Sequence, residues 1–398
     1  MTSEGERQSD RVSRRKFLLT SGAVGAAGVA GCLGGGGDST PTAEPADGDG
    51  GSDGNASTPT PEGMDTSTLK AEGSSTVYPI SRKGSSYWNS NAPPSDGEYW
   101  GKAKNDAGET IKVPGWSEIR TDKNLADYFA GLYGYEPTGQ QANPPFGTQV
   151  GLSHSGTGCK AVRDGLVDIG NSSGPITAEL GISEKKAKNT YVDHVVGRDG
   201  QPVVVSSEIY EAGVKQLTGK QVRDIYQGRV SNWSEVGGPD KEIFVVGRAE
   251  GSGTDTSFRI NMLGSANAPM EVDTRKGQNQ QVKTVVANND NAIGYMALAF
   301  TNEQVVPIAI NFEGTVYKPD KDAEHTIYDS DYPLNRDLHM YTKKTDETPS
   351  GTSVKEAAFI NMFLTTFGQK AFVEGVGYIP LPTKDIETEK EKLPDPEM

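Results

Sequence analysis

Three short runs of Gly, Ser and Thr constrain this sequence most, because each lies beside an extended or apolar run and ahead of an expected helix. The runs are Gly73–Thr76, Ser155–Gly158 and Gly251–Thr254. Small residues let backbone N–H groups approach a ligand closely, and a helix N-terminus directs several such donors at one point. Arg248 adds a planar charged donor three residues before the third run. If the runs meet in space, they replace the water around a small oxyanion with fixed hydrogen bonds, so the sequence predicts an anion-binding protein.

The chain is acidic, with 39 Lys and Arg against 54 Asp and Glu and a formal net charge of −15. This charge argues against nucleic acid as a partner, because the phosphate backbone is repelled by it. An acidic surface suits strong brine, where the Debye length falls to roughly 3 Å at 1 M salt, and we therefore expect a halophilic archaeal source. Attraction of an anion must then come from local donors rather than from the charge of the whole protein.

Residues 1–31 have the features of an export signal. Paired arginines in Ser13–Leu18 are typical of twin-arginine export, and the weakly apolar run after them is shorter than the roughly 20 residues of a membrane-spanning helix. Val29–Cys32 resembles a lipobox, which predicts a lipid on Cys32 and a place at the extracytoplasmic face of the cell membrane. An ordinary signal with a chance cysteine is the alternative. Residues 32–68 are rich in Gly, Asp, Ser, Thr and Pro and predict a flexible tether.

The remainder of the chain alternates expected strands with expected helices. Strand patterns lie at 69–72, 203–205, 243–246, 292–296, 305–310 and 337–341, and helical spacing lies at 214–226, 256–263 and 354–367. Thr218 and Gln221 have the spacing of a capping box within the first of these helices, and the last helix opens with the same pattern at Ser353 and Glu356. The folded part exceeds one ordinary core, so we predict two α/β lobes with parallel or mixed sheets. The stretch 82–149 is interpreted as a helix with a surface elaboration.

Chemistry other than binding has little support in the residues. The run 154–160 superficially resembles a nucleotide P-loop, but Cys159 separates Gly158 from Lys160. A Gly-x-Ser-x-Gly nucleophile elbow is absent from this run, and the four histidines lack metal-ligand spacing. We interpret His154 as a loop residue beside the site and Cys159 as a buried packing residue rather than a nucleophile. The prediction is therefore no catalytic residue, no metal and no cofactor.

Several segments occur in an order that matches a known family. They are Gly73–Pro79, Ser155–Gly158, Asp168–Gly170, Val230–Trp233, Gly247–Thr254, Ala292–Tyr295 and Gly377–Pro382. Together they resemble the substrate-binding lipoproteins of ABC phosphate importers over most of residues 69–385. The resemblance implies an α/β, two-lobed periplasmic-binding-protein-like fold (type II), in which each lobe is a mixed or parallel sheet flanked by helices and a two-stranded hinge joins the lobes. The implied parts are lobe I at 69–196 plus 304–388, with an insertion at about 82–149, lobe II at 197–303, and a flexible C-terminus at 389–398.

The resemblance also implies a set of ligand contacts in which hydroxyls and backbone N–H groups from both lobes surround the anion with one guanidinium. These contacts are Thr76, Val77, Ser155, Ser173, Arg248, Ser252, Gly253 and Thr254. The residues expected to support them are Ser75, Gly156, Thr157 and Glu250. Glu250 lies two residues after Arg248, where it can hold the guanidinium or accept a ligand proton.

One position departs from the family pattern. Well-known members have an Asp soon after the Asp-x-Gly segment, and this position falls on Ser173. A carboxylate only accepts hydrogen bonds and so excludes fully ionised sulfate, whereas a hydroxyl both donates and accepts. Phosphate is the predicted ligand, and sulfate or another tetrahedral oxyanion stays open.

The resemblance implies two protein partners, a membrane permease and its ATPase. We expect the receptor to be a monomer, which the lipid on Cys32 holds at the membrane. A secreted phosphatase or other phosphoester hydrolase is the rival interpretation, but it needs a nucleophile with a base, or metal ions. A sensory or adhesive lipoprotein is a third. We expect a binding protein and not an enzyme.

Overall fold

The computed structural model describes residues 63–101, 103–104, 110–111 and 119–396. The expected export signal, Cys32 and most of the expected tether therefore lie outside the described residues. By its internal contacts the chain separates into two units, Met1–Ala56 and Ser57–Met398, and every described residue belongs to the second unit.

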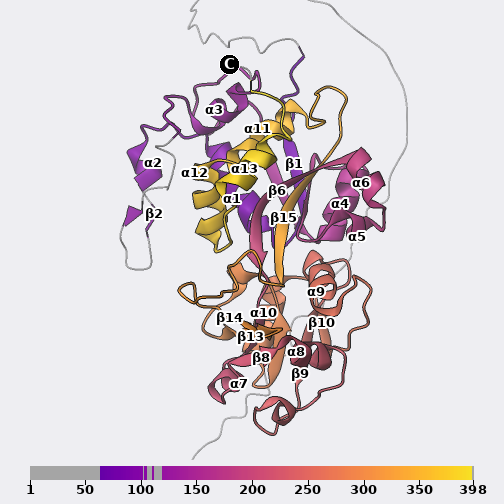
Figure 1. Ribbon diagram of the computed structural model, residues 1–398. Helices are drawn as coiled ribbons and strands as arrows, with labels where there is room; N and C mark the ends of the chain where they lie inside the picture. The colour runs from indigo at the N-terminus through magenta and orange to yellow at the C-terminus, as the bar shows by residue number, and fades with distance from the viewer. Residues whose placement is uncertain (1–62, 102, 105–109, 112–118, 397–398) are drawn as a thin grey trace, which may run out of the picture. The chain divides into compact units, whose positions relative to one another are not determined.

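Lobe I is built on a five-stranded mixed sheet in the order β4-β1-β5-β15-β6 (Figure 1). Strand β1 is parallel to both β4 and β5, while β15 is antiparallel to both β5 and β6. The strands are β1 Leu69–Ser74, β4 Thr148–Ser153, β5 Ile169–Ser172, β6 Tyr191–Gly200 and β15 Asn335–Lys343. Because parallel neighbours end at the same edge of a sheet, β1, β4 and β5 direct the loops that follow them to one place.

Helices cover both faces of this sheet. Helix α4 packs against β1 and β5 on one face, and α1, α3 and α11 pack together on the other (Figure 1). The helices of this part of the chain are α1 Tyr78–Ser90, α2 Gly97–Gly101, α3 Leu125–Gly131, α4 Ser155–Arg163, α5 Ile176–Leu180, α6 Glu184–Thr190, α11 Val354–Phe363, α12 Thr366–Gly368, the π-helical turn η4 Gln369–Val373, the 3₁₀ turn η5 Glu374–Val376 and α13 Thr383–Lys390. A short antiparallel pair is formed by β2 Ala103–Lys104 and β3 Thr110–Ile111.

Lobe II contains a second five-stranded sheet, in the order β10-β9-β11-β7-β12, and a three-stranded sheet in the order β14-β13-β8. Its strands are β7 Val203–Ser206, β8 Gln216–Thr218, β9 Phe244–Arg248, β10 Thr274–Lys276, β11 Ala292–Tyr295, β12 Val305–Pro307, β13 Ala309–Phe312 and β14 Thr315–Tyr317. Its helices are α7 Ser207–Glu211, α8 Gly219–Tyr226, η2 Trp233–Val236, α9 Gly253–Leu263, α10 Asn279–Ala287 and η3 Leu298–Phe300. Both sheets mix parallel and antiparallel pairs, and the two-lobed α/β prediction is confirmed.

Strand pairing places the end of lobe II later in the sequence than residue 303, where it was expected. Strand β12 pairs with β7, and β13 pairs with β8, so residues 305–317 belong to the sheets of lobe II. The chain rejoins the first sheet only at β15. Strands β6 and β15 pair antiparallel with one irregularity between Leu338 and His339, and in Figure 1 they run from the first sheet toward the elements of lobe II. That they act as the two-stranded hinge stays a prediction.

Most of the expected strands and helices are present, and the exceptions have local causes. The helix expected at 214–226 begins only at Gly219, because the preceding residues pair with β13 as strand β8. The helix expected to continue to 367 ends at Phe363, because Thr365 caps a new short helix. Both predicted capping boxes, at Thr218 and at Ser353, are formed.

The tryptophans of 82–149 that the structure describes belong to the core rather than to a surface elaboration. Trp88 is fully buried, its ring packs against Phe146 and Phe359, and its Nε1 donates to the carbonyl oxygen of Phe146 at 2.8 Å. Trp100 is also buried. The third tryptophan, Trp116, lies outside the described residues.

Both ends of the described chain are anchored on lobe I. Lys355 pairs with Asp65 at 2.6 Å, inside the expected tether. Leu393 is buried and Lys392 donates to the carbonyl oxygen of Asp193 at 2.7 Å, inside the expected flexible C-terminus. Packing contacts with lobe I thus extend into the last residues of the expected tether and into the expected flexible C-terminus. Among the described helices, none combines the length and the apolar character that a bilayer crossing requires.

Candidate functional site

The fold brings the three Gly-, Ser- and Thr-rich runs to one place between the lobes. The first run ends β1 and precedes α1, and the second opens α4 directly after β4. The third run lies between β9 and α9 in lobe II. The hydroxyls of Thr76 and Thr254 are 3.2 Å apart, and the backbone N–H of Gly156 donates to the carbonyl oxygen of Gly251 at 3.1 Å. The convergence that the sequence predicted is therefore observed in the structure.

Arg248 is a buried cation of this site, with only 1% of its surface exposed. Its Nη1 donates to Asn279 Oδ1 at 2.7 Å, its Nη2 to the carbonyl oxygen of Gly277 at 2.7 Å, and its Nε to that of Lys276 at 3.1 Å. A longer bond of 3.3 Å joins Nη2 to Ser75 Oγ across the lobes. Burial lowers the pKa of Arg248 to about 10, so the guanidinium stays charged at neutral pH.

Glu250 does not hold this guanidinium, contrary to expectation. Its side chain is 81% exposed, and its carboxylate is 3.9 Å from Arg259 instead. Backbone carbonyls and Asn279 already accept the N–H groups of Arg248. Glu250 lies on the turn before Gly251, and Gly251 has a positive φ of 77°. The support expected from a carboxylate comes from neutral acceptors.

Ser173 lies among the hydroxyls of lobe I. Ser74 Oγ donates to Ser173 Oγ at 2.9 Å, and the backbone N–H of Ser173 donates to Ser155 Oγ at 3.1 Å. All three serines are buried. The position that carries a carboxylate in the resembling family is therefore part of a hydroxyl cluster that both donates and accepts hydrogen bonds.

Gly253 packs against this cluster from lobe II, and no other residue fits there without movement. A Cβ at this position would lie 2.3 Å from Ser155 Oγ and 2.8 Å from Ser173 Oγ. Val77, Ser252 and Thr254 are buried at the same junction, whereas Thr157 is exposed on α4. Thr157 is thus the one predicted supporting residue, besides Glu250, that lies on the surface.

Two residues that sequence reasoning missed contact the predicted ones. Asn279, at the start of α10, donates from Nδ2 to Thr76 Oγ1 at 3.2 Å. Arg336, on β15, donates from Nη2 to the same oxygen at 3.4 Å and is itself buried. Neither has a Gly-rich neighbourhood to mark it. Only the pairing of distant segments brings these side chains to Thr76.

Cys159 and His154 are the groups beside the site that would suggest catalysis. Burial raises the pKa of Cys159 to about 12, and the thiol packs with Val162 and Tyr341 as predicted. Burial, with the charge of Arg248, lowers the pKa of His154, which keeps its ring neutral. No group of three or more His, Cys, Asp or Glu suited to a metal ion occurs in the described part of the chain.

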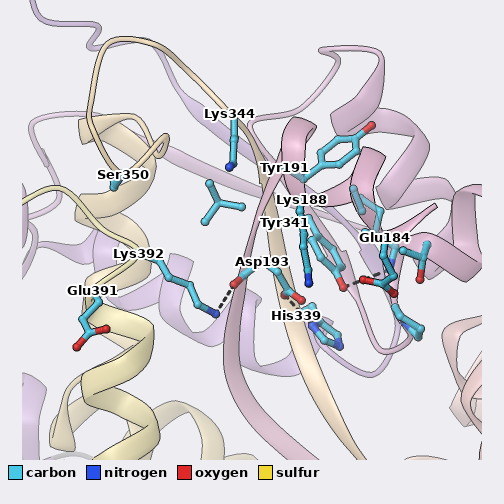
Figure 2. Close-up of a pocket in the computed structure, with 15 residues that line it drawn as sticks. Glu184, Lys188, Tyr191, Asp193, His339, Tyr341, Lys344, Ser350, Glu391 and Lys392 are labelled. Atoms are coloured by element: carbon cyan, nitrogen blue, oxygen red, sulfur yellow. Dashed lines mark hydrogen bonds and ion pairs between the residues drawn. The ribbon is translucent and has the colours of Figure 1, made fainter. Parts of the chain in front are cut away.

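A separate cavity of about 540 Å³ lies in lobe I beside β6 and β15 (Figure 2). Lys188, Lys344 and Lys392 stand around it, together with the pair of Asp193 and His339. None of its lining residues is among the predicted anion contacts. The candidate site is thus the closed junction of the three runs and not this cavity.

Comparison with known proteins agrees with this geometry. The PBP superfamily domain matches residues 136–366, more than half of the chain. The phosphate-binding protein PstS of Bacillus subtilis is 32% identical over 241 residues, which cover 61% of this chain and 73% of that protein. The chain belongs to the PstS family of the PBP superfamily.

Two further similar proteins share less sequence with this chain. PstS of Staphylococcus saprophyticus is 27% identical over 256 residues, which cover 62% of this chain and 75% of that protein. A solved ABC transporter substrate-binding protein from Clostridium perfringens, which holds bound phosphate, superposes with a TM-score of 0.54 and 20% identity over 79% of this chain and all of that one. This last likeness supports the two-lobed fold.

Proposed function

We propose that this protein binds inorganic phosphate between its two lobes and delivers it to an ABC permease. The observation that carries the proposal is that buried hydroxyls and backbone N–H groups of both lobes meet at the buried guanidinium of Arg248. The relatives add the ligand, because they are named phosphate-binding proteins. The proposed contacts are those inferred from the sequence, with Asn279 in place of Glu250 as the support of Arg248.

Local donors suffice for useful affinity. About eight charge-assisted hydrogen bonds, at roughly 1.5–3 kcal/mol each, offset the dehydration of the anion and its lost motion. A remainder of about −8 kcal/mol corresponds to a Kd near 1 μM. The net charge of −15 works against long-range attraction, so the fixed donors must supply this free energy.

Closure of the lobes is proposed as the signal to the permease. The contacts of Thr76 with Thr254 and of Gly156 with Gly251 join the lobes directly at the site. A ligand that bridges the same groups favours this closed arrangement by its differential affinity. The permease and its ATPase then recognise the occupied receptor.

The proposed location is the outer face of the cell membrane. Support comes from the twin-arginine pattern of Ser13–Leu18 and from the lipobox-like Val29–Cys32. We propose that Cys32 carries a lipid, that the mature chain acts as a monomer, and that its acidity reflects a saline habitat. Mass spectrometry of protein from the native membrane tests the lipid, since an unmodified mature N-terminus would contradict it.

Titration calorimetry tests the proposed ligand. Phosphate is expected to bind with a stoichiometry of one, and sulfate is expected to bind measurably but more weakly, because Ser173 replaces the carboxylate that rejects sulfate. Absence of phosphate binding would contradict the proposal. Hydrolysis of a chromogenic phosphate ester by the pure protein, lost when Arg248 is replaced, would favour the phosphatase interpretation instead.

A further inference from the structure

Arg336 forms a buried ion pair between the two hinge strands. It lies on β15 directly opposite Asp199 on β6. Its Nη2 and Nε donate to Asp199 Oδ2 at 2.6 and 3.0 Å. The other carboxylate oxygen, Oδ1, accepts the backbone N–H of Leu298 from lobe II at 2.8 Å. Both oxygens of Asp199 are thus occupied, and the guanidinium is fixed in orientation.

The remaining N–H groups of Arg336 donate to residues of the proposed anion site. Its Nη1 donates to the carbonyl oxygens of Gly253, in lobe II, at 3.2 Å and of Ser173, in lobe I, at 3.4 Å. Its Nη2 reaches Thr76 Oγ1 at 3.4 Å. One side chain on the hinge therefore contacts three residues of the proposed site and touches both lobes at once.

Two other buried polar groups near Arg336 have no protein hydrogen-bond partner among the described residues. They are the hydroxyl of Tyr378 and Oε1 of Gln201. Nε2 of Gln201 donates to the carbonyl oxygen of Thr254 at 2.8 Å, which places this side chain beside the third run. Polar atoms buried without a partner are costly. Gln201 leaves one beside the third run, and Tyr378 leaves one within electrostatic reach of Arg248 and Arg336.

The charges explain why a second guanidinium is useful there. Arg248 and Arg336 are close enough to repel each other. Asp199 pairs with Arg336, while Asp255, the other carboxylate that acts on Arg248, already pairs with Arg259 and Arg275. Asp199 therefore compensates only one of the two positive charges. A bound anion compensates the other. We propose that Arg336 is a second anion-recognition residue of this site, oriented by Asp199, whose contribution is made only when the lobes are closed. The inference rests on the proposed phosphate binding and extends it to the hinge.

The neighbouring pair of hinge residues provides a matched control. Arg198 on β6 lies opposite Asp337 on β15, and Nε of Arg198 is 2.9 Å from the Asp337 carboxylate. Successive residues of a strand point to opposite faces, so this pair also joins the hinge strands but contacts none of the proposed anion ligands. It joins the same two strands, but it is more exposed than the pair of Arg336 and Asp199, and Arg198 also pairs with Asp385 at 2.7 Å.

Calorimetry with inorganic phosphate on the full-length protein tests the inference. Arg336→Met is expected to weaken binding by about 30-fold or more, while Arg198→Met stays within about threefold of the unchanged protein. Arg336→Lys, which keeps the charge, is expected to recover part of the loss. Equal weakening by Arg336→Met and Arg198→Met would show a purely structural role and overturn the inference.

Asp199→Asn keeps the test decisive if Arg336→Met does not fold. Asparagine keeps one oxygen that can accept from Arg336 and so preserve its orientation, but it carries no charge. The site then gains one net positive charge and phosphate affinity is expected to rise, whereas a merely structural pair predicts a fall. A fall would overturn the inference. Failure of the unchanged protein to bind phosphate would refute the proposed function itself, while normal binding that Arg248→Met abolishes and Arg336→Met leaves intact would refute the role of Arg336 alone.

Discussion

Replacing Arg248 with Met tests how the site holds its anion. The guanidinium has five N–H groups, and backbone carbonyls and Asn279 engage three of them, one each through Nε, Nη1 and Nη2. Of the remaining two, one makes only the 3.3 Å contact with Ser75 Oγ, and we assign both to the bound anion. Two charge-assisted hydrogen bonds to the anion are worth about 3–6 kcal/mol, so phosphate affinity should fall by about 10²- to 10⁴-fold.

Calorimetric titration measures this loss, and thermal unfolding without ligand separates it from loss of the fold. Arg248→Met also frees the carbonyl oxygens of Lys276 and Gly277, so a modest fall in melting temperature is expected. Arg163→Met is the control, because Arg163 is a half-exposed arginine on α4 that pairs with its neighbour Asp164. If Arg248→Met keeps phosphate affinity within about threefold while it remains folded, the reasoning is refuted.

Three further changes probe Gly253 and Ser173 of the site and the buried carboxyl of Glu179 on α5. Gly253→Ala places a Cβ 2.3 Å from Ser155 Oγ, so it should prevent closure and weaken phosphate binding by about 100-fold or more while circular dichroism stays unchanged; normal affinity would show that the lobes need not close this tightly. Ser173→Asp introduces an acceptor-only carboxylate, so competition titrations should show a larger preference for phosphate over sulfate; an unchanged ratio would mean that Ser173 does not face the ligand. Burial raises the pKa of Glu179 to about 7 from an ordinary 4.5, which means that its ionisation costs more in the folded protein and that stability is lost as pH rises through this window. Glu179→Gln should therefore raise the melting temperature at pH 8 and leave it unchanged near pH 4, and equal effects at both pH values would contradict this origin.

The local chemistry of the site could be predicted from the sequence because it depends on short runs. Gly251–Thr254 combines small residues with the start of α9, and Arg248 ends the strand before it. The capping boxes at Thr218 and Ser353 are equally local, since each needs only residues three apart. Such patterns specify backbone geometry and donor direction without knowledge of the rest of the fold.

The parts that were missed depend on contacts between distant segments. Arg336 reaches Thr76 only because β15 is inserted between β5 and β6. Residues 216–218 form a strand because β13, about 90 residues later, pairs with them. The exposure of Glu250 follows from acceptors supplied by β10 and α10, which its own neighbourhood does not reveal.

The central claim is that three distant runs of the chain and Arg248 surround one tetrahedral anion. A crystal structure of the protein grown with phosphate tests this most directly. We expect one phosphate between the lobes, with oxygens in hydrogen-bond reach of Thr76, Ser155, Arg248 and Thr254. Phosphate bound elsewhere, such as in the lysine-lined cavity of Figure 2, with the junction of the runs unchanged and empty, would contradict the account.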